Sequence, residues 1–224
     1  MPGGHPDTIA HELNSVPAAD AVDPQRERLL QIATWLVAAT LAYNVIEGIV
    51  AIWFGVAADS DALVAFGLDS GIECFAAGVM LWRLLSRHDD ERREVFARKA
   101  IGASFLVLAA YVVAQSCWTL VAKEAPSTSL VGIVLGSLSL LIMPGLSWAK
   151  LRLAARLESK ALRAEALETL ACSYLTVTLL IGLGANSLLG SWWADPAAAM
   201  LMVPWLVREG LEGGRGSDGC ASKC

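Results

Sequence analysis

The most regular feature of the chain is a series of long apolar runs separated by short polar segments. A run of about 20 apolar residues can cross the hydrocarbon core of a membrane as one α-helix. Six segments approach this length, at residues 29–56, 62–85, 100–122, 129–149, 161–185 and 192–211. The pattern therefore predicts an all-α membrane protein with six transmembrane helices.

Polar segments set the limits of these helices, at residues 59–61, 86–99, 123–129, 150–160 and 186–191. They divide the chain into a polar tail at residues 1–28, a six-helix domain at residues 29–212 and a short flexible tail at residues 213–224. The first 25 residues are polar and lack the apolar core of a secretory signal peptide. We therefore expect the first tail to remain on the protein.

The basic residues indicate the direction of insertion, because cytoplasmic segments retain Lys and Arg. With the N-terminus in the cytoplasm, every Lys and Arg except Lys123 falls in or next to a cytoplasmic segment. We therefore expect both termini to be cytoplasmic. The expected location is a multi-pass position in the plasma membrane, which in a bacterium is the inner membrane.

Composition supports this class and excludes others. The chain is 55% hydrophobic and 17% charged, with a mean hydropathy of +0.53. Its net charge is −5 and its basic residues form no stripe, so it lacks the electrostatic footprint of a nucleic-acid-binding protein. The five cysteines form no CxxC pair and predict no disulfide framework. We find no motif of an enzyme and expect no cofactor.

Four residues inside the predicted spans have ionisable side chains, which are rare in apolar helices. The second span holds Asp69 and Glu73, and the fifth holds Glu168 and Cys172. Each pair has i, i+4 spacing, which places both side chains on one face of a helix. Ionisable residues within spans are costly and mark ion or proton pathways. We therefore treat these four residues as the candidate site.

The two pairs lie at the same depth in the membrane. With span centres near Ile72 and Tyr174, a rise of 1.5 Å per residue puts all four within roughly 9 Å of the midplane. Three carboxylates and a thiol supply four donors, the number that a tetrahedral Zn²⁺ site uses. Because metal ligands must be deprotonated, metal binding there would release protons.

Simpler interpretations stand beside this one. A solvated face is the usual role of an acidic i, i+4 pair in a soluble helix, but lipid offers no such solvation. Cys172 alone is compatible with a small buried apolar residue, and only its register with Glu168 favours a ligand. Glu165 lies next to Arg163 near the end of its span, which suits an interfacial ion pair as well as a gate.

Further accessory residues are open to two interpretations each. Asn44 and Glu47 in the first span could join helices by hydrogen bonds or contact the metal directly. Cys220 and Cys224 have a spacing suited to capturing a soft metal, but a Gly-rich terminus is also typical of a disordered end.

Two strings of residues resemble motifs of the cation diffusion facilitator family, over about residues 29–212. One is Asn44-Val45-Ile46-Glu47-Gly48 followed by SDALVAFGLDSGIE at residues 60–73, and the other is SKALRAEALETLAC at residues 159–172. Asp69 and Glu73 fall on the family's first pair of ligand positions. Glu168 falls on a position usually held by His, and Cys172 on one usually held by Asp. A thiolate favours soft or borderline ions.

The resemblance implies a transmembrane domain of that family, in a short member that lacks the cytoplasmic C-terminal domain. It implies efflux of a divalent cation, Zn²⁺ first and Cd²⁺ second, in exchange for protons by alternating access. The partners are then the metal ion, protons and the lipid bilayer, and a homodimer is one open oligomeric state. The alternative function is a membrane metal-binding protein, such as a sensor or accessory subunit, that does not transport.

Overall fold

The computed structural model describes residues 24–57, 61–86, 91–122, 130–189 and 193–215, and these residues form six α-helices and no strand. The helices are α2 (Pro24–Ala57), α3 (Asp61–Leu84), α4 (Glu91–Ala122), α5 (Leu130–Leu157), α6 (Lys160–Leu189) and α7 (Ala194–Gly214). The prediction of an all-α protein with six helices is therefore confirmed. Most of both tails lies outside the described residues.

Three predicted polar segments are wrong in part, because the neighbouring helices continue into them. The segment 86–99 is helical from Glu91 onward, and the segment 150–160 is helical up to Leu157. α6 likewise continues to Leu189. Lys, Arg and Glu are good helix formers, so their charge marks the edge of an apolar run without ending the helix.

Helices α2 to α6 contain stretches that are long and apolar enough to cross a membrane, and α7 does not meet the same criterion within the described residues. The charges of α7 gather in its last turns. Arg208 Nε donates to Glu212 Oε1 at 2.8 Å, and Glu209 lies 3.8 Å from Arg163 at the start of α6. The hydrogen bond from Arg208 lowers the pKa of the Glu212 carboxyl. The apolar part of α7 is therefore confined to the residues before Arg208.

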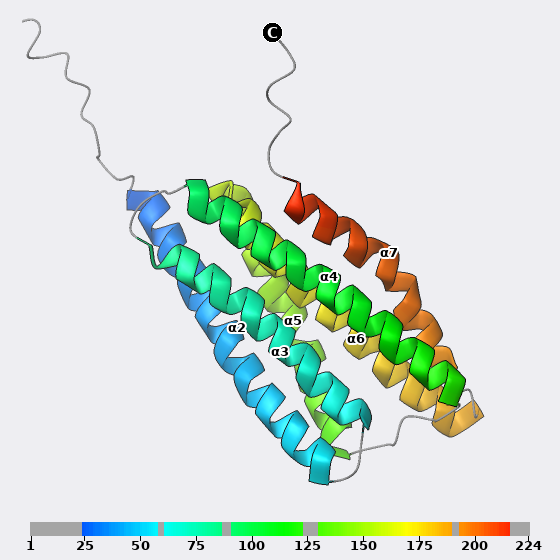
Figure 1. Ribbon diagram of the computed structural model, residues 1–224. Coiled ribbons are helices and arrows are strands. Elements are labelled where there is room, and N and C mark those ends of the chain that lie inside the picture. The colour runs from blue at the N-terminus through cyan, green and yellow to red at the C-terminus, as the bar shows by residue number, and fades with distance from the viewer. Residues whose placement is uncertain (1–23, 58–60, 87–90, 123–129, 190–192, 216–224) are drawn as a thin grey trace, which may run out of the picture.

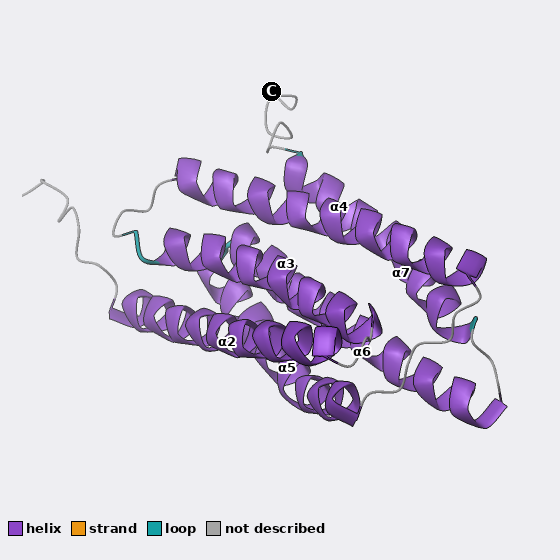
Figure 2. Cartoon of the chain, turned by 60° about the horizontal axis from the view of Figure 1, so that its bottom comes forward, coloured by secondary structure: helices purple, strands orange, loops and turns teal. Residues whose placement is uncertain are grey.

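The six helices form a bundle of three close pairs, α2 with α3, α4 with α7 and α5 with α6 (Figures 1 and 2). The α4–α7 pair lies against α3 and α6. The first residue of α2 and the last of α7 lie at the same end of the bundle (Figure 1). The two ends of the described chain therefore reach the same side of the fold.

The surface of the bundle is apolar and its interior contains polar groups, the reverse of a soluble protein. Many large apolar side chains are exposed, among them Trp35, Trp53, Val121, Leu141 and Leu201. Small and polar residues lie inside, where they allow helices to approach closely. This distribution is what a lipid-facing bundle requires.

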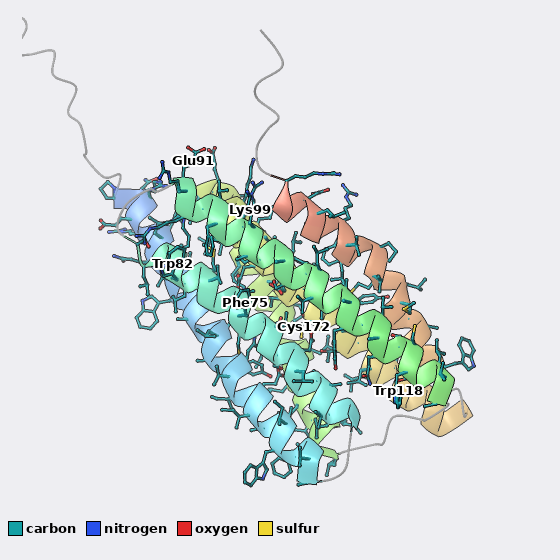
Figure 3. The ribbon with its side chains drawn as sticks, in the orientation of Figure 1. Phe75, Trp82, Glu91, Lys99, Trp118 and Cys172 are labelled. Atoms are coloured by element: carbon teal, nitrogen blue, oxygen red, sulfur yellow. The ribbon has the colours of Figure 1, made fainter. Side chains whose placement is uncertain are left out.

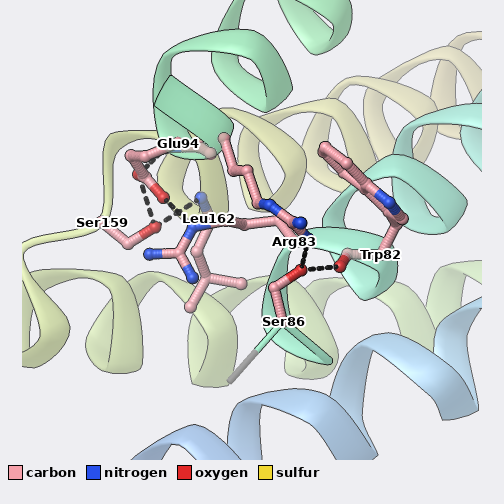
Figure 4. A network of polar contacts seen from close by, with 8 residues as sticks. Trp82, Arg83, Ser86, Glu94, Ser159 and Leu162 are labelled. Atoms are coloured by element: carbon pink, nitrogen blue, oxygen red, sulfur yellow. Dashed lines mark hydrogen bonds and ion pairs between the residues drawn. The ribbon is translucent and has the colours of Figure 1, made fainter. Parts of the chain in front are cut away.

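A polar network joins three helices at one end of the bundle (Figure 4). Glu94 of α4 accepts hydrogen bonds from Arg83 Nε at 3.0 Å and from Ser159 Oγ at 2.8 Å. It also accepts from the Ala161 backbone N–H at 2.8 Å, and Ser159 caps the first turn of α6 by accepting from the Leu162 N–H. The network fixes where α3 ends and where α6 begins, about one turn before Glu165 and two turns before Glu168.

Candidate metal site

The residues of the candidate site lie near the middle of the two central helices. The midpoint of α3 falls between Ile72 and Glu73, and the midpoint of α6 falls next to Tyr174. Asp69, Glu73, Glu168 and Cys172 are all buried, with exposed fractions of 6%, 4%, 1% and 1%. Because α3 and α6 pack against each other, the two pairs face the same interior level of the bundle.

Contacts between the two helices bring the pairs together. The Asp69 carboxyl and the Cys172 thiol are close enough to interact with each other. Glu73 and Glu168 interact electrostatically with each other, and both interact with Asp69. Figure 3 shows Cys172 in the interior of the bundle, midway along it. The four predicted site residues therefore belong to one buried cluster.

Most of the carboxylate oxygens in this cluster make no hydrogen bond. Both oxygens of Glu73, both of Glu168 and Oδ1 of Asp69 are buried without a partner. Ser104 lies near Glu168, but its hydroxyl donates to the Ile101 carbonyl. Buried polar groups in folded proteins nearly always have partners, so such a concentration of exceptions needs a cause. A bound cation or protons would supply the partners that these oxygens lack.

The cluster is not a closed coordination shell. Within the described residues, no three Asp, Glu, His or Cys side chains come close enough together to hold a metal ion. Carboxylates on facing helices repel one another when no cation lies between them. The donor types suit a divalent cation, but the side chains would have to converge to bind it.

Glu47 of α2 has hydrogen-bond partners of its own. It accepts from Tyr43 Oη at 3.2 Å and from Ser70 Oγ at 3.1 Å. It also interacts electrostatically with Asp69 and Glu73. The bond to Ser70 joins α2 to α3, which is the interhelical role foreseen for Glu47. Its proximity to the cluster leaves the direct metal role as a prediction.

Asn44 of α2 is fully buried, and neither atom of its amide group has a hydrogen-bond partner. The interhelical hydrogen bond expected for Asn44 is therefore wrong among the described residues. A buried amide without a partner is costly, so direct contact between Asn44 and a metal ion stays a prediction.

Glu165 forms an ion pair, but its partner is not the adjacent Arg163. Glu165 Oε1 lies 2.7 Å from Lys150 Nζ, whereas Arg163 is half exposed and pairs with Glu209. Residues two apart in a helix point in different directions. The expectation of an interfacial pair is therefore wrong in its position, since both members of the pair are buried.

Lys150 is the residue of this region that sequence reasoning missed, because it was assigned to a cytoplasmic loop. It lies within α5 and is fully buried. A pattern in the sequence could have located it. The buried positions of α5 include Gly136, Ser139, Met143 and Ser147, and Lys150 continues the same three- and four-residue spacing.

Cys220 and Cys224 lie outside the described residues, so their capture of metal stays a prediction.

The chain matches the model of a known protein family. The family model described as the cation efflux transmembrane domain matches residues 37–215. The matched segment includes every residue of the buried cluster and reaches the end of α7. No curated protein matches the chain.

Proposed function

Because the chain belongs to the cation efflux family and therefore exports divalent cations across a membrane, we propose that its substrate is Zn²⁺, with Cd²⁺ as a second substrate, exchanged for protons. The observation that carries the proposal is the buried cluster of Asp69, Glu73, Glu168 and Cys172, in which five carboxylate oxygens have no hydrogen-bond partner. Three carboxylates and a thiolate match the number and type of donors that Zn²⁺ accepts.

The donor set favours a borderline or soft ion over a hard one. Mg²⁺ prefers six oxygen ligands in a strict octahedron and gives up its bound water reluctantly. A thiol at Cys172 adds no advantage for such an ion, but it strengthens binding of Zn²⁺ and still more of Cd²⁺. The interaction between Cys172 and Asp69 supports a ligand role for the sulfur.

Proton exchange follows from the same residues. A carboxyl or thiol must lose its proton before it can bind the metal, so an incoming ion displaces protons and returning protons release the ion. The helices would present the cluster to one side of the membrane and then to the other. Five carboxylate oxygens without fixed partners suit this cycle, since no hydrogen bond has to break when the ion binds.

The first test removes one ligand from each helix. We expect Asp69→Ala and Glu168→Ala each to abolish proton-coupled Zn²⁺ flux in proteoliposomes, while the protein still inserts and remains monodisperse in detergent. The matched control is Glu91→Ala, because Glu91 is an exposed acid at the first turn of α4, far from the cluster (Figure 3). This control should transport at the parental rate.

The same vesicles distinguish transport from binding alone. A parental protein that binds Zn²⁺ but moves none would favour the sensor or accessory function. If both alanine variants transport Zn²⁺ as fast as the parent, the buried cluster is not the transport site.

A further inference from the structure

Lys150 is a buried cation inside the membrane-spanning part of the bundle. Among the residues that the structure describes, it is the only buried Lys or Arg. Its Nζ donates to Glu165 Oε1 at 2.7 Å and to Thr169 Oγ1 at 2.8 Å. One turn away, Ser147 Oγ donates to the Ala166 carbonyl at 2.7 Å. The ammonium is therefore held by α6 in a fixed position, along a closely packed helix pair.

Stability alone does not account for this pair. Taking an ammonium and a carboxylate out of water costs several kcal/mol per ion by order of magnitude, and well-packed apolar residues in their place are often as stable or more stable. Ionisable residues within spans instead mark functional positions. We therefore expect the Lys150–Glu165 pair to affect the neighbouring cluster.

Position connects the pair to the proposed metal site. Glu165 lies three residues before Glu168, on the same side of α6, and its second oxygen is buried without a partner. The charge of Lys150 acts on both Glu73 and Glu168. Low-dielectric surroundings make such interactions stronger than at a protein surface. A change in the net charge of the pair must therefore change the electrostatic potential at Glu73 and Glu168.

We propose that Lys150 is a tethered counter-cation of the proposed metal site, which neutralises Glu165 and thereby sets the affinity of the cluster for a divalent cation. With Lys150 in place the pair contributes no net charge, and the cluster binds metal through its own donors alone. Moderate affinity suits a transporter, because an ion held too tightly would not be released. This inference rests on the proposed function, since it assumes that the cluster binds metal.

A charge cycle tests the proposal with purified full-length protein and Zn²⁺ alone as the probe. The variants are Lys150→Arg, Lys150→Met, Glu165→Gln and the double variant Lys150→Met/Glu165→Gln. Zn²⁺ affinity is measured at fixed neutral pH by competition with a chelating dye. The pair carries no net charge in the parent, in Lys150→Arg and in the double variant. It gains a negative charge in Lys150→Met and a positive charge in Glu165→Gln.

Affinity should follow the net charge of the pair. We expect Glu165→Gln to weaken Zn²⁺ binding by about tenfold or more, and Lys150→Met to strengthen it. Lys150→Arg and the double variant should bind within about threefold of the parent. A merely structural pair would not give this recovery, because the double variant removes both hydrogen bonds to Glu165 and Thr169.

The comparison of Glu165→Gln with the double variant decides the question even if Lys150→Met fails to fold. If the double variant remains as weak as Glu165→Gln, then Glu165 acts without Lys150 and the proposal is wrong. If the parent itself binds no Zn²⁺, the proposed function fails and this inference falls with it. A parent that binds Zn²⁺, together with a cycle that shows no change, overturns the inference alone.

Discussion

At the scale of single residues, the site is distinguished by the thiol at Cys172. The other three members of the cluster are carboxyl groups, which bind hard and borderline ions alike. Cys172 interacts with Asp69 of α3, and in the proposed site the two side chains would bind the same ion. Selectivity between soft and hard ions should therefore depend on this one side chain.

Replacing the sulfur should change which metals compete. We expect Cys172→Asp to narrow the preference for Cd²⁺ over Mn²⁺, because a carboxylate gains less than a thiolate from a polarisable ion. The pH dependence of uptake should also change, since a free thiol titrates near 8.5 and a free aspartate near 3.9. Competitive uptake of the two ions into proteoliposomes across a pH series measures both effects.

The control for this substitution is Cys117→Ser, because Cys117 is exposed on α4 and no contact joins it to the cluster in the described structure. It should leave the ratio of Cd²⁺ to Mn²⁺ uptake unchanged. Equal ratios in the parent and in Cys172→Asp at every pH would identify Cys172 as a packing residue.

The sequence predicted the burial of the four cluster residues but not the partner of Glu165. The i, i+4 pairs in α3 and α6 identify the buried face of each helix, because ionisable side chains within a span face the interior of the bundle and not the lipid. The partner of Glu165 could not be found in this way. Lys150 stands two residues before Arg152 at the end of an apolar run, a pattern that is typical of a loop at the membrane surface. Only the packing of α5 on α6 shows that it points inward.

At the scale of helices, close packing of α4 on α7 depends on glycine. A Cβ atom added at Gly213 would lie 2.7 Å from the Cα of Gly102 and 3.1 Å from the carbonyl oxygen of Arg98. Both atoms belong to the backbone of α4, so no side chain can move aside. The two helices touch directly here, as small residues allow in membrane proteins.

A methyl group at this contact should separate the two helices. We expect Gly213→Ala to destabilise the protein by about 1–3 kcal/mol, the usual cost of overpacking. The matched control is Gly214→Ala in the same turn, where an added Cβ meets nothing within 4 Å. The melting temperature in detergent should fall for Gly213→Ala and stay near the parental value for Gly214→Ala. Equal melting temperatures would show that the helices do not pack so closely.

Helix ends were harder to predict than helices. The apolar runs predicted the number of helices, because a chain in lipid must pair its backbone N–H and C=O groups within a helix. The ends depend on local hydrogen bonds that no hydropathy pattern shows. Glu94 is one example, since its bonds to Arg83 and Ser159 hold the end of α3 and the first turn of α6 together.

At the scale of the whole molecule, the even number of helices explains why the described chain begins and ends on one side (Figure 1). The arrangement leaves open which side of the membrane this is. The distribution of Lys and Arg predicts that the described chain begins and ends on the cytoplasmic side. Lys150 no longer counts among these basic residues, because it lies inside the bundle. The remaining basic residues still favour the same orientation, because Lys123 is the only one between the predicted outer ends of the spans.

The two cysteines of the C-terminal tail provide a direct test of this orientation. In intact cells, a membrane-impermeant maleimide should leave Cys220 and Cys224 unlabelled, and permeabilising the plasma membrane should make both react. The variant Cys220→Ser/Cys224→Ser is the control, since any label that it takes up must come from Cys74, Cys117 or Cys172. If the tail reacts equally in intact cells, the protein is inserted the other way round. The network of Glu94, which lies at the same end of the bundle as the start of α2 and the end of α7 (Figure 1), would then face the outside, and metal efflux would begin at the opposite end of the bundle.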